Sequence, residues 1–198
     1  MSKRSARSAQ ISRETKETSI ELTLNLDGTG QVEVATGLGF LDHMFTALAR
    51  HSRFDLSLKC NGDLEVDDHH TVEDCAIAFG EALDEALGER RGITRFGYAY
   101  APLDEALARA VVDLSGRPAP VVNLGLRREM LGEVACENLH HVFVTLANRS
   151  RASIHVDVLR GDNDHHRVEA AFKALALALK QAVRLDGTEE IPSTKGVL

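Results

Sequence analysis

DDHHTVEDCAIAFGEALDEAL, residues 67–87, returns 96 residues later as NDHHRVEAAFKALALALKQAV, residues 163–183. In both stretches apolar residues recur at steps of three and four, which is the period of an amphipathic α-helix. The apolar positions are Val72, Cys75, Ala76, Phe79, Leu83 and Ala86 in the first stretch and Val168, Ala171, Phe172, Leu175, Leu179 and Ala182 in the second. The sequence therefore predicts the same helix twice, with the same buried face.

Each predicted helix carries a His pair near its start and a Glu one turn later. His69 and Glu73 are four residues apart, as are His165 and Glu169. This spacing stacks an imidazole and a carboxylate on one helix face, about 5 to 6 Å apart at the Cβ atoms, where one metal ion can bind both. The second His of each pair is turned about 100° around the helix and is free for another ion. These second residues are His70 and His166.

The residues before the His pairs, Asp68 and Asp164, are predicted N-caps. Capping there would place both pairs in first turns, where the helix dipole keeps the rings neutral for ligation. Mixed imidazole and carboxylate donors suit Mn, Fe or Ni better than a Cys-rich structural zinc site. A single His at a helix start is more often a surface polar group, but matched donors in both halves favour a two-metal site.

A second repeat lies upstream of each predicted helix. HMFTALARHSR from His43 and HVFVTLANRSR from His141 are identical at six of eleven positions, with an offset of 98 residues. The two-residue difference between the offsets falls between the repeats, where we expect a hairpin turn to absorb it. Each half thus adds one His from an earlier helix to its donor set.

Composition limits the remaining possibilities. The 198 residues fit one domain or two small intimate ones. A net charge of -7 with 9 His argues against nucleic-acid binding. Three Cys without CxxC spacing predict reduced thiols in the cytoplasm, and no apolar run reaches membrane-spanning length. Residues 1–10, MSKRSARSAQ, are predicted to be a disordered tail rather than the remnant of a transit peptide.

The rest of the chain predicts an α+β fold of two ββαββα half-domains, residues 11–90 and 91–198, with helices packed on one face of each sheet. In the first half we expect a strand at 11–24 that turns at 27–30 into 31–36, a helix at 41–51, a hairpin of 54–60 with 63–67, and a helix ended by Gly88. In the second we expect strands at 94–100, 107–114, 121–126 and 154–159, and helices at 136–149 and from the second His pair to about residue 184.

Several motifs resemble blocks of one enzyme family. They are RETKET (13–18), TGLGFLDHM (36–44), GDLEVDDHHTVED (62–74), RRGITRFG (90–97), LSGRP (114–118), DNDHHRVEA (162–170) and PSTKG (192–196). In this order they are similar to the monofunctional imidazoleglycerol-phosphate dehydratases of histidine biosynthesis, from about Arg13 to Leu198. The resemblance implies a ribosomal-S5-domain-2-like fold and a homo-oligomer of about 24 subunits. It also implies two Mn²⁺ per active site, with sites completed at subunit contacts and no nucleic-acid or membrane partner.

The resemblance further implies a division of the metal ligands. One ion would be bound by His43, His69, Glu73 and His166, and the other by His141, His165, Glu169 and His70. His140 stands beside His141 as an alternative ligand, but the match of HVF to HMF favours His141.

The reaction implied is the dehydration of D-erythro-imidazole glycerol phosphate to imidazole acetol phosphate, through a di-metal-bound imidazolate and a diazafulvene-type intermediate. Glu17 would be the general acid or base, with Glu73 and Glu169 as catalytic ligands. The implied substrate contacts are Glu17, His51, Arg95, Arg117, Lys173, Ser193 and Lys195, and PSTKG predicts an ordered C-terminal loop that closes over the substrate. A histidine-rich metal-storage or sensor protein and a two-metal hydrolase are the rival functions.

Overall fold

The computed structural model describes residues 6–198 and contains two half-domains with the same order of elements. The first half comprises β1 (Ser8–Glu14), β2 (Thr18–Asn25), β3 (Val32–Ala35), α1 (Gly39–Ser52), β4 (Asp55–Gly62) and α2 (His69–Leu87). The second comprises β5 (Phe96–Leu103), β6 (Ala106–Asp113), β7 (Ala119–Asn123), α3 (Cys136–Arg149), β10 (Ser153–Arg160) and α4 (Asp164–Ala182). A short hairpin, β8 (Met130–Leu131) and β9 (Val134–Ala135), precedes α3.

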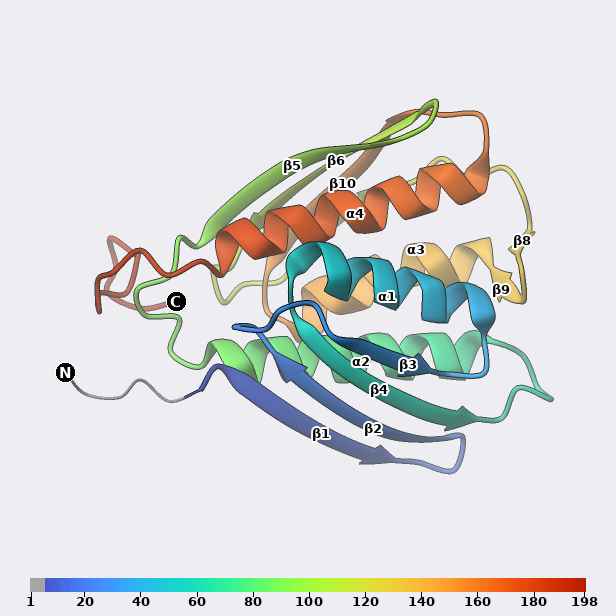
Figure 1. The fold of residues 1–198 in the computed structure, drawn as a ribbon, viewed down its shortest axis with the longest axis horizontal. Coiled ribbons are helices and arrows are strands. Elements are labelled where there is room, and N and C mark those ends of the chain that lie inside the picture. Colours follow the sequence, from blue (N-terminus) through green and yellow to red (C-terminus); the bar gives the residue numbers. More distant parts are fainter. Residues whose placement is uncertain (1–5) are drawn as a thin grey trace.

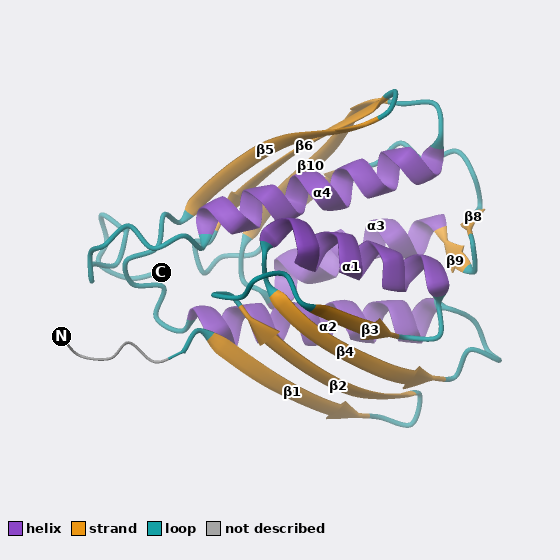
Figure 2. Ribbon diagram, in the orientation of Figure 1, coloured by secondary structure: helices purple, strands orange, loops and turns teal. Residues whose placement is uncertain are grey.

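Two four-stranded sheets enclose a layer of four helices (Figures 1 and 2). The strand orders, β1-β2-β4-β3 and β5-β6-β10-β7, are equivalent, and the third strand of each half runs parallel to its neighbour. Helix α2 packs on β1 and β2, and α4 packs on β5 and β6. Helix α1 packs against α4, and α3 packs against α2, so the two halves meet through their helices. The predicted α+β sandwich is confirmed.

The predicted strand order of each half is wrong, because each half is βββαβα rather than ββαββα. The run 11–24 is two strands, since the Thr15 hydroxyl accepts the N–H groups of Glu17 and Thr18 and makes a turn there. The segment 31–36 pairs in parallel with β4 instead of forming a hairpin with β2, because α1 provides the crossover that parallel strands need. Residues 63–67 form no strand and lead through a turn into α2.

The predicted buried face of the duplicated helix is confirmed in both copies. All twelve apolar positions named for α2 and α4 are buried, and the rings of Phe143 and Phe172 lie 4.6 Å apart at their centroids. A Cβ added to Gly97 in β5 would lie 1.9 Å from the Ala178 carbonyl oxygen, so only glycine allows α4 to lie this close to the sheet. These contacts hold α4 against α3 on one side and against β5 on the other.

The ends of the elements refine other expectations. Gly88 follows α2 with φ 53°, as predicted for its C-terminal glycine. The expected tail at 1–10 is too long, because β1 begins at Ser8, and residues 1–5 of that tail lie outside the described residues. The two-residue length difference lies between the last strand of each half and its His pair, not in a hairpin turn: six residues (63–68) separate β4 from His69, and four (161–164) separate β10 from His165. Among the described residues, no helix combines the length and apolar character needed to cross a membrane.

Candidate metal centre

The two His pairs lie at the N-terminal ends of α2 and α4, at the same end of the molecule (Figure 1). The helix starts are capped by the residue before each predicted cap: Asp67 Oδ1 accepts the N–H of His69 at 2.8 Å, and Asn163 Oδ1 accepts that of His165 at 2.9 Å. Asp68 occupies the N-cap position of α2, as predicted, but its side chain makes no capping hydrogen bond, and the prediction of Asp164 is wrong because Asn163 is the N-cap of α4.

Asp68 and Asp164 are instead buried carboxylates that hold the segment leading to α3. Asp68 Oδ2 accepts the N–H of Ala135 at 2.8 Å, and Asp164 Oδ2 accepts those of Arg127 and Arg128, both at 2.7 Å. Because the preceding residue supplies the cap, these two side chains are free to turn inward. They tie α2 and α4, which we call the signature helices, to the segment that leads to α3.

The first cluster of donors combines α1 with α4. His43 Nε2 lies 3.0 Å and His165 Nε2 3.2 Å from Glu169 Oε2. One ligand atom from each residue lies within 4.8 Å of the others, the spacing expected of donors around a single ion. We call His43, His165 and Glu169 the α1/α4 triad.

The second cluster combines α3 with α2 and is slightly more open. His141 Nε2 lies 3.1 Å from Glu73 Oε1, and His69 Nε2 lies 3.7 Å from Glu73 Oε2. Asn138, which is 6% exposed, places its Oδ1 2.9 Å from His69 Nδ1. An acceptor there keeps the ring proton on Nδ1 and leaves Nε2 free to bind a metal. We call His69, Glu73 and His141 the α2/α3 triad.

Within one chain the donors are grouped differently from the implied division, which allows ligands from more than one subunit and stays a prediction. That division joined His43 to His69 and Glu73, whereas His43 lies with the donors of α4 and His141 with those of α2. The reason is the helix packing, in which each early helix contacts the signature helix of the other half. His141 rather than His140 is the residue that reaches a Glu, as the sequence match favoured.

His70 and His166 join neither triad. His70 Nδ1 lies 3.1 Å from Asp63 Oδ2, and His166 Nδ1 lies 2.7 Å from Glu105 Oε2. Each ring is turned away from its helix neighbour by nearly a right angle, with interplanar angles of 74° for the first pair and 86° for the second. The predicted separation of the two His in each pair is confirmed.

Both triads have the chemistry of a divalent-cation site. Each offers two imidazole nitrogens and one carboxylate and leaves coordination positions open, a donor set suited to Mn, Fe or Ni. Burial would raise the pKa of Glu169, but hydrogen bonds from Lys173 and His43 lower it to about 2. Glu169 therefore stays negatively charged, as a cation site requires.

Two predicted substrate contacts lie beside the α1/α4 triad. Lys173 Nζ is 2.7 Å from Glu169 Oε1. Partial burial and the neighbouring Lys173 ammonium lower the pKa of His51, which also faces the charge of Glu169. This side of the triad can accept a negatively charged group.

The other predicted phosphate contacts lie at the opposite end of the molecule, where α4 finishes. Arg95 donates to both oxygens of Asp113, at 2.7 and 3.1 Å, and to the Pro192 carbonyl at 2.7 Å. Ser193 and Lys195 follow in the same loop, and Gly116, next to Arg117, contacts the C-terminal residue. The backbone N–H of Arg95 bonds to the last residue of α4, 17 residues beyond His165 and about 26 Å along the helix.

Glu17 lies in the turn between β1 and β2 with its side chain 53% exposed. Its Oε1 is 3.6 Å from His70 Nε2. Glu17 therefore accompanies His70 rather than either triad.

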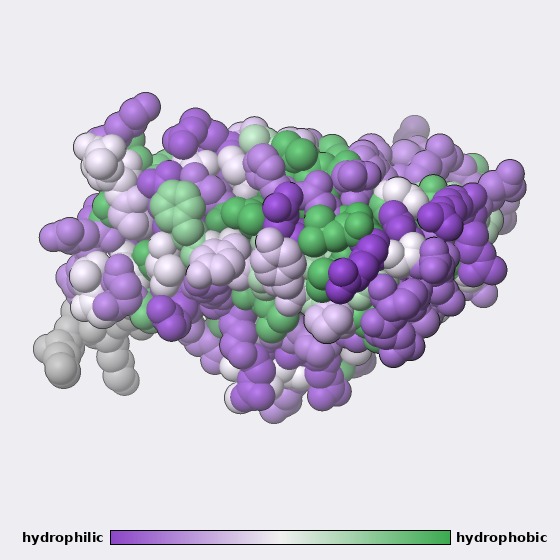
Figure 3. All heavy atoms as spheres, turned by 90° about the horizontal axis from the view of Figure 1, so that it is seen from above, coloured by the Kyte–Doolittle hydropathy of each residue, from purple (hydrophilic) through white to green (hydrophobic). Residues whose placement is uncertain are grey.

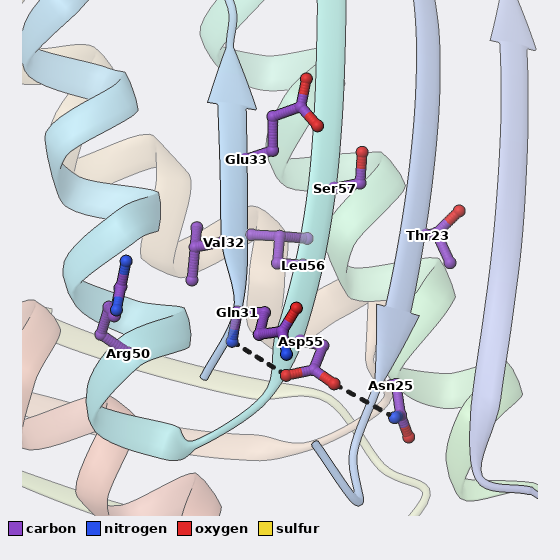
Figure 4. Close-up of a pocket in the computed structure, with 9 residues that line it drawn as sticks. All are labelled: Thr23, Asn25, Gln31, Val32, Glu33, Arg50, Asp55, Leu56 and Ser57. Atoms are coloured by element: carbon purple, nitrogen blue, oxygen red, sulfur yellow. Dashed lines mark hydrogen bonds between the residues drawn. The ribbon is translucent and has the colours of Figure 1, made fainter. Parts of the chain in front are cut away.

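The hollow drawn in Figure 4 is a different part of the surface and contains none of the predicted site residues. At its base Asp55 Oδ1 accepts the N–H groups of Thr29, Gly30 and Gln31 at 2.8 to 3.0 Å. These bonds, that from Gln31 foremost, lower the pKa of Asp55 against the effect of burial. The Asp55 carboxylate is used to fix the loop before β3.

Sequence reasoning missed three residues that contact donor rings: Asn138, Asp63 and Glu105. The strand registers relate β1–β2 to β5–β6 by an offset of 88 residues, so Glu105 is the counterpart of Glu17. Asn138 corresponds to Phe40 at the 98-residue offset of the early helices, and Asp63 lies in a loop whose length differs between the halves. The two sequence repeats that identified the donors, at offsets of 96 and 98 residues, do not extend to these three residues.

In the metal-free protein, His166 is expected to titrate above the ordinary histidine range, because the hydrogen bond to Glu105 raises its pKa. With a folded pKa above the unfolded one, protonation of His166 stabilises the fold below the ordinary pKa, and this stabilisation is lost as the pH rises through the folded pKa. NMR titration of the ring protons measures the shift. Glu105→Gln should return the pKa toward the ordinary range, and an unchanged pKa would contradict this cause.

Comparison with known proteins gives one consistent family. Residues 36–179 match the family model described as imidazoleglycerol-phosphate dehydratase. A protein of that name from Phytophthora nicotianae is 60% identical over 99% of the chain, which spans 43% of that relative's length. One from Kluyveromyces lactis is 51% identical, with 97% of both proteins covered.

Two solved structures are also similar to the chain. Imidazoleglycerol-phosphate dehydratase from Staphylococcus aureus has a TM-score of 0.81 at 35% identity, covering 90% of this chain and 99% of that one. The enzyme from Pyrococcus furiosus, in complex with (S)-C348, has a TM-score of 0.81 at 40% identity, covering 95% and 100%. Both likenesses extend over the two half-domains together.

Proposed function

Because the chain belongs to the imidazoleglycerol-phosphate dehydratase family, it is a hydro-lyase of histidine biosynthesis, and we propose that it dehydrates imidazole glycerol phosphate with two bound divalent cations. The observation that carries the metal proposal is the pair of matched triads. Each brings two imidazoles and one carboxylate from helices of both halves to one point. We propose Mn²⁺ as the ion.

The cations would supply Lewis acidity, which favours loss of the proton from the substrate ring. The protein's own groups hold and orient the reactants. Glu73 and Glu169 provide negative charge between paired imidazoles. Glu17 is our candidate for the group that moves a proton to or from the glycerol chain, because its carboxylate is exposed and accessible to a bound substrate.

We propose that each active site is shared between copies of the chain. Within one chain the triads and the phosphate contacts are separated by about the length of α4, some 26 Å. That is much longer than the three-carbon chain that joins ring and phosphate in the substrate. His70, Glu17 and His166 also face away from their own triads. A neighbouring copy can bring His166 to the α2/α3 triad, and His70 with Glu17 to the α1/α4 triad.

The surface of the second sheet supports an oligomer. Its outer face carries exposed Phe96, Tyr98 and Tyr100 on β5, with Val111 on β6 and Val121 on β7. Tyr98, Val111, His155 and Val121 lie in register across the sheet, and Figure 3 shows apolar and aromatic side chains gathered on this side. The outer face of the first sheet has Ser19, Glu21 and Ser57 instead. An apolar face of this kind is typical of a surface buried between subunits. The expected number of about 24 copies rests on the resemblance.

We place the enzyme in the cytoplasm. All three cysteines are free, as expected of a reducing compartment. No nucleic-acid or membrane partner is proposed, because the net charge is -7.

Turnover is expected to depend on added metal. Protein stripped of metal should give no imidazole acetol phosphate in a coupled spectroscopic assay. Adding Mn²⁺ should restore the reaction, because no side chain of the triads can supply the Lewis acidity of the cation. Hydrolysis of a simple phosphoester serves as the control for a two-metal hydrolase. Full activity of the stripped protein, or phosphoester turnover alone, would contradict the proposal.

A further inference from the structure

His70 and His166 each have a carboxylate beside Nδ1, although the two carboxylates come from different parts of the chain. The two oxygens of Asp63 lie 3.1 and 3.2 Å from His70 Nδ1, and Glu105 Oε2 lies 2.7 Å from His166 Nδ1. A carboxylate at Nδ1 keeps the ring proton there and directs the lone pair of Nε2 outward. We propose that Asp63 and Glu105 are positioning residues, which hold His70 and His166 as ligands for the metal ions of a neighbouring copy. This inference rests on the proposed function.

The duplication of the fold does not explain the two carboxylates. Asp63 belongs to the loop between β4 and α2, residues 63–68, whereas the equivalent loop between β10 and α4 is only residues 161–163. The shorter loop also has an acid, Asp162, but its side chain is 90% exposed and pairs with Arg127 at 3.9 Å. In the second half Glu105 reaches the ring from the tip of the β5–β6 hairpin instead. Two unrelated backbones thus bring the same group to the same ring atom.

Both carboxylates are held in place by their surroundings. Glu105 Oε1 accepts the N–H groups of Asn163 at 2.9 Å and Asp162 at 3.1 Å, which leaves Oε2 for His166. Asp63 donates its N–H to the Glu17 carbonyl at 3.0 Å and accepts the N–H of Val66 at 2.8 Å in a tight turn. A fixed acceptor fixes the plane of the ring that donates to it.

The free nitrogens of both rings face solvent-exposed acids rather than a triad. His70 Nε2 lies 3.6 Å from Glu17, and His166 Nε2 lies 3.8 Å from Asp104, whose side chain is 75% exposed. These nitrogens are therefore presented at the surface. A His that must bind an ion held by another molecule benefits most when its ring is already oriented. Loss of a carboxylate that orients a metal-binding ring typically weakens metal binding about 10- to 100-fold.

The test measures Mn²⁺ binding to metal-free full-length protein by the EPR signal of the free ion, which needs no turnover. Glu105→Ala should weaken one of the two Mn²⁺ bound per chain by about 10- to 100-fold. Glu105→Gln keeps an oxygen that can accept from Nδ1 and should recover most of the affinity. Asp162→Ala, which removes an exposed acid from the adjoining loop, should bind as wild type does. Circular dichroism and thermal unfolding check that each variant is folded.

The same design applies to the first half, with Asp63→Ala, Asp63→Asn and the exposed Glu65→Ala as control. The Asp63 and Glu105 variants should affect different ions, so the double alanine variant should bind both weakly. Saturating Mn²⁺ should restore kcat in each single alanine variant, because only the orientation of a ligand is lost.

The inference is overturned if the alanine variants bind both ions with wild-type affinity, or if alanine and amide variants lose the same amount. Wild-type protein that binds no Mn²⁺ would instead reject the proposed function. The two failures are distinct, because failure of this inference is seen only when the wild-type protein binds Mn²⁺ and serves as the reference for the variants.

Discussion

His69→Ala is expected to reduce turnover by more than about 100-fold. Loss of a group that only hydrogen-bonds to a metal ligand already costs up to about 100-fold, and His69 is itself a proposed ligand. His69 provides one of the three donors of the α2/α3 triad, with its Nε2 3.7 Å from Glu73. The variant leaves Glu73 with only His141 and deprives Asn138 of its ring partner. If the ion also joins neighbouring copies, the oligomer should become less stable, which light scattering at decreasing protein concentration would measure.

The control for this variant is His140→Ala. His140 is adjacent to His141 on α3 and is exposed, and His141 is the residue that contacts Glu73, so activity and assembly should stay at the wild-type level. Both variants remove an imidazole from the same region of the helical layer. A His69→Ala protein with full rate and full assembly would show that the α2/α3 triad is not a ligand set.

The helical layer was predictable because its signal is local. Burial of Phe79 and Phe172 follows from the three- and four-residue period within each stretch, and helical periodicity needs no knowledge of partners. The equivalence of the two copies then locates His69 and His165 at equivalent helix starts. Only the capping side chain was misplaced, by one position in each helix, because several adjacent polar residues can cap.

The strands were harder to predict because their pairing is not local. Whether residues 31–36 pair with β2 or with β4 depends on α1 crossing between β3 and β4. Both arrangements bury the same alternating residues, so the sequence pattern does not distinguish them. The turn at Thr15 was missed because its hydroxyl replaces the Gly or Asn that usually marks a hairpin.

The grouping of the metal donors also depended on tertiary packing. Spacing shows that His69 and Glu73 share a helix face, but not which early helix lies opposite. That choice follows from α3 packing on α2 and α1 on α4, which brings His141 and His43 to the other half's signature helix.

Mixed assemblies should recover activity that neither parent has, if sites are shared between copies. His43→Ala damages the α1/α4 triad, and His70→Ala removes the donor we assign to that triad from a neighbouring copy. Each homogeneous variant should be nearly inactive. When the two chains are co-expressed with different tags and purified through both, about a quarter of the sites should combine an intact triad with an intact His70, because each part is intact with even odds in a random symmetric assembly.

The matched control pairs His43→Ala with His165→Ala. These two residues belong to one triad, with their ring centroids 5.8 Å apart in the same chain, so every triad in the mixture lacks one of them. No activity should return in this mixture, although its chains assemble in the same way. Recovery in the first mixture alone requires that His70 acts across a subunit boundary. If neither mixture recovers activity although co-assembly is confirmed, each chain completes its own site. The distance of about 26 Å between the triads and the phosphate contacts would then have to be closed by a conformational change within the chain.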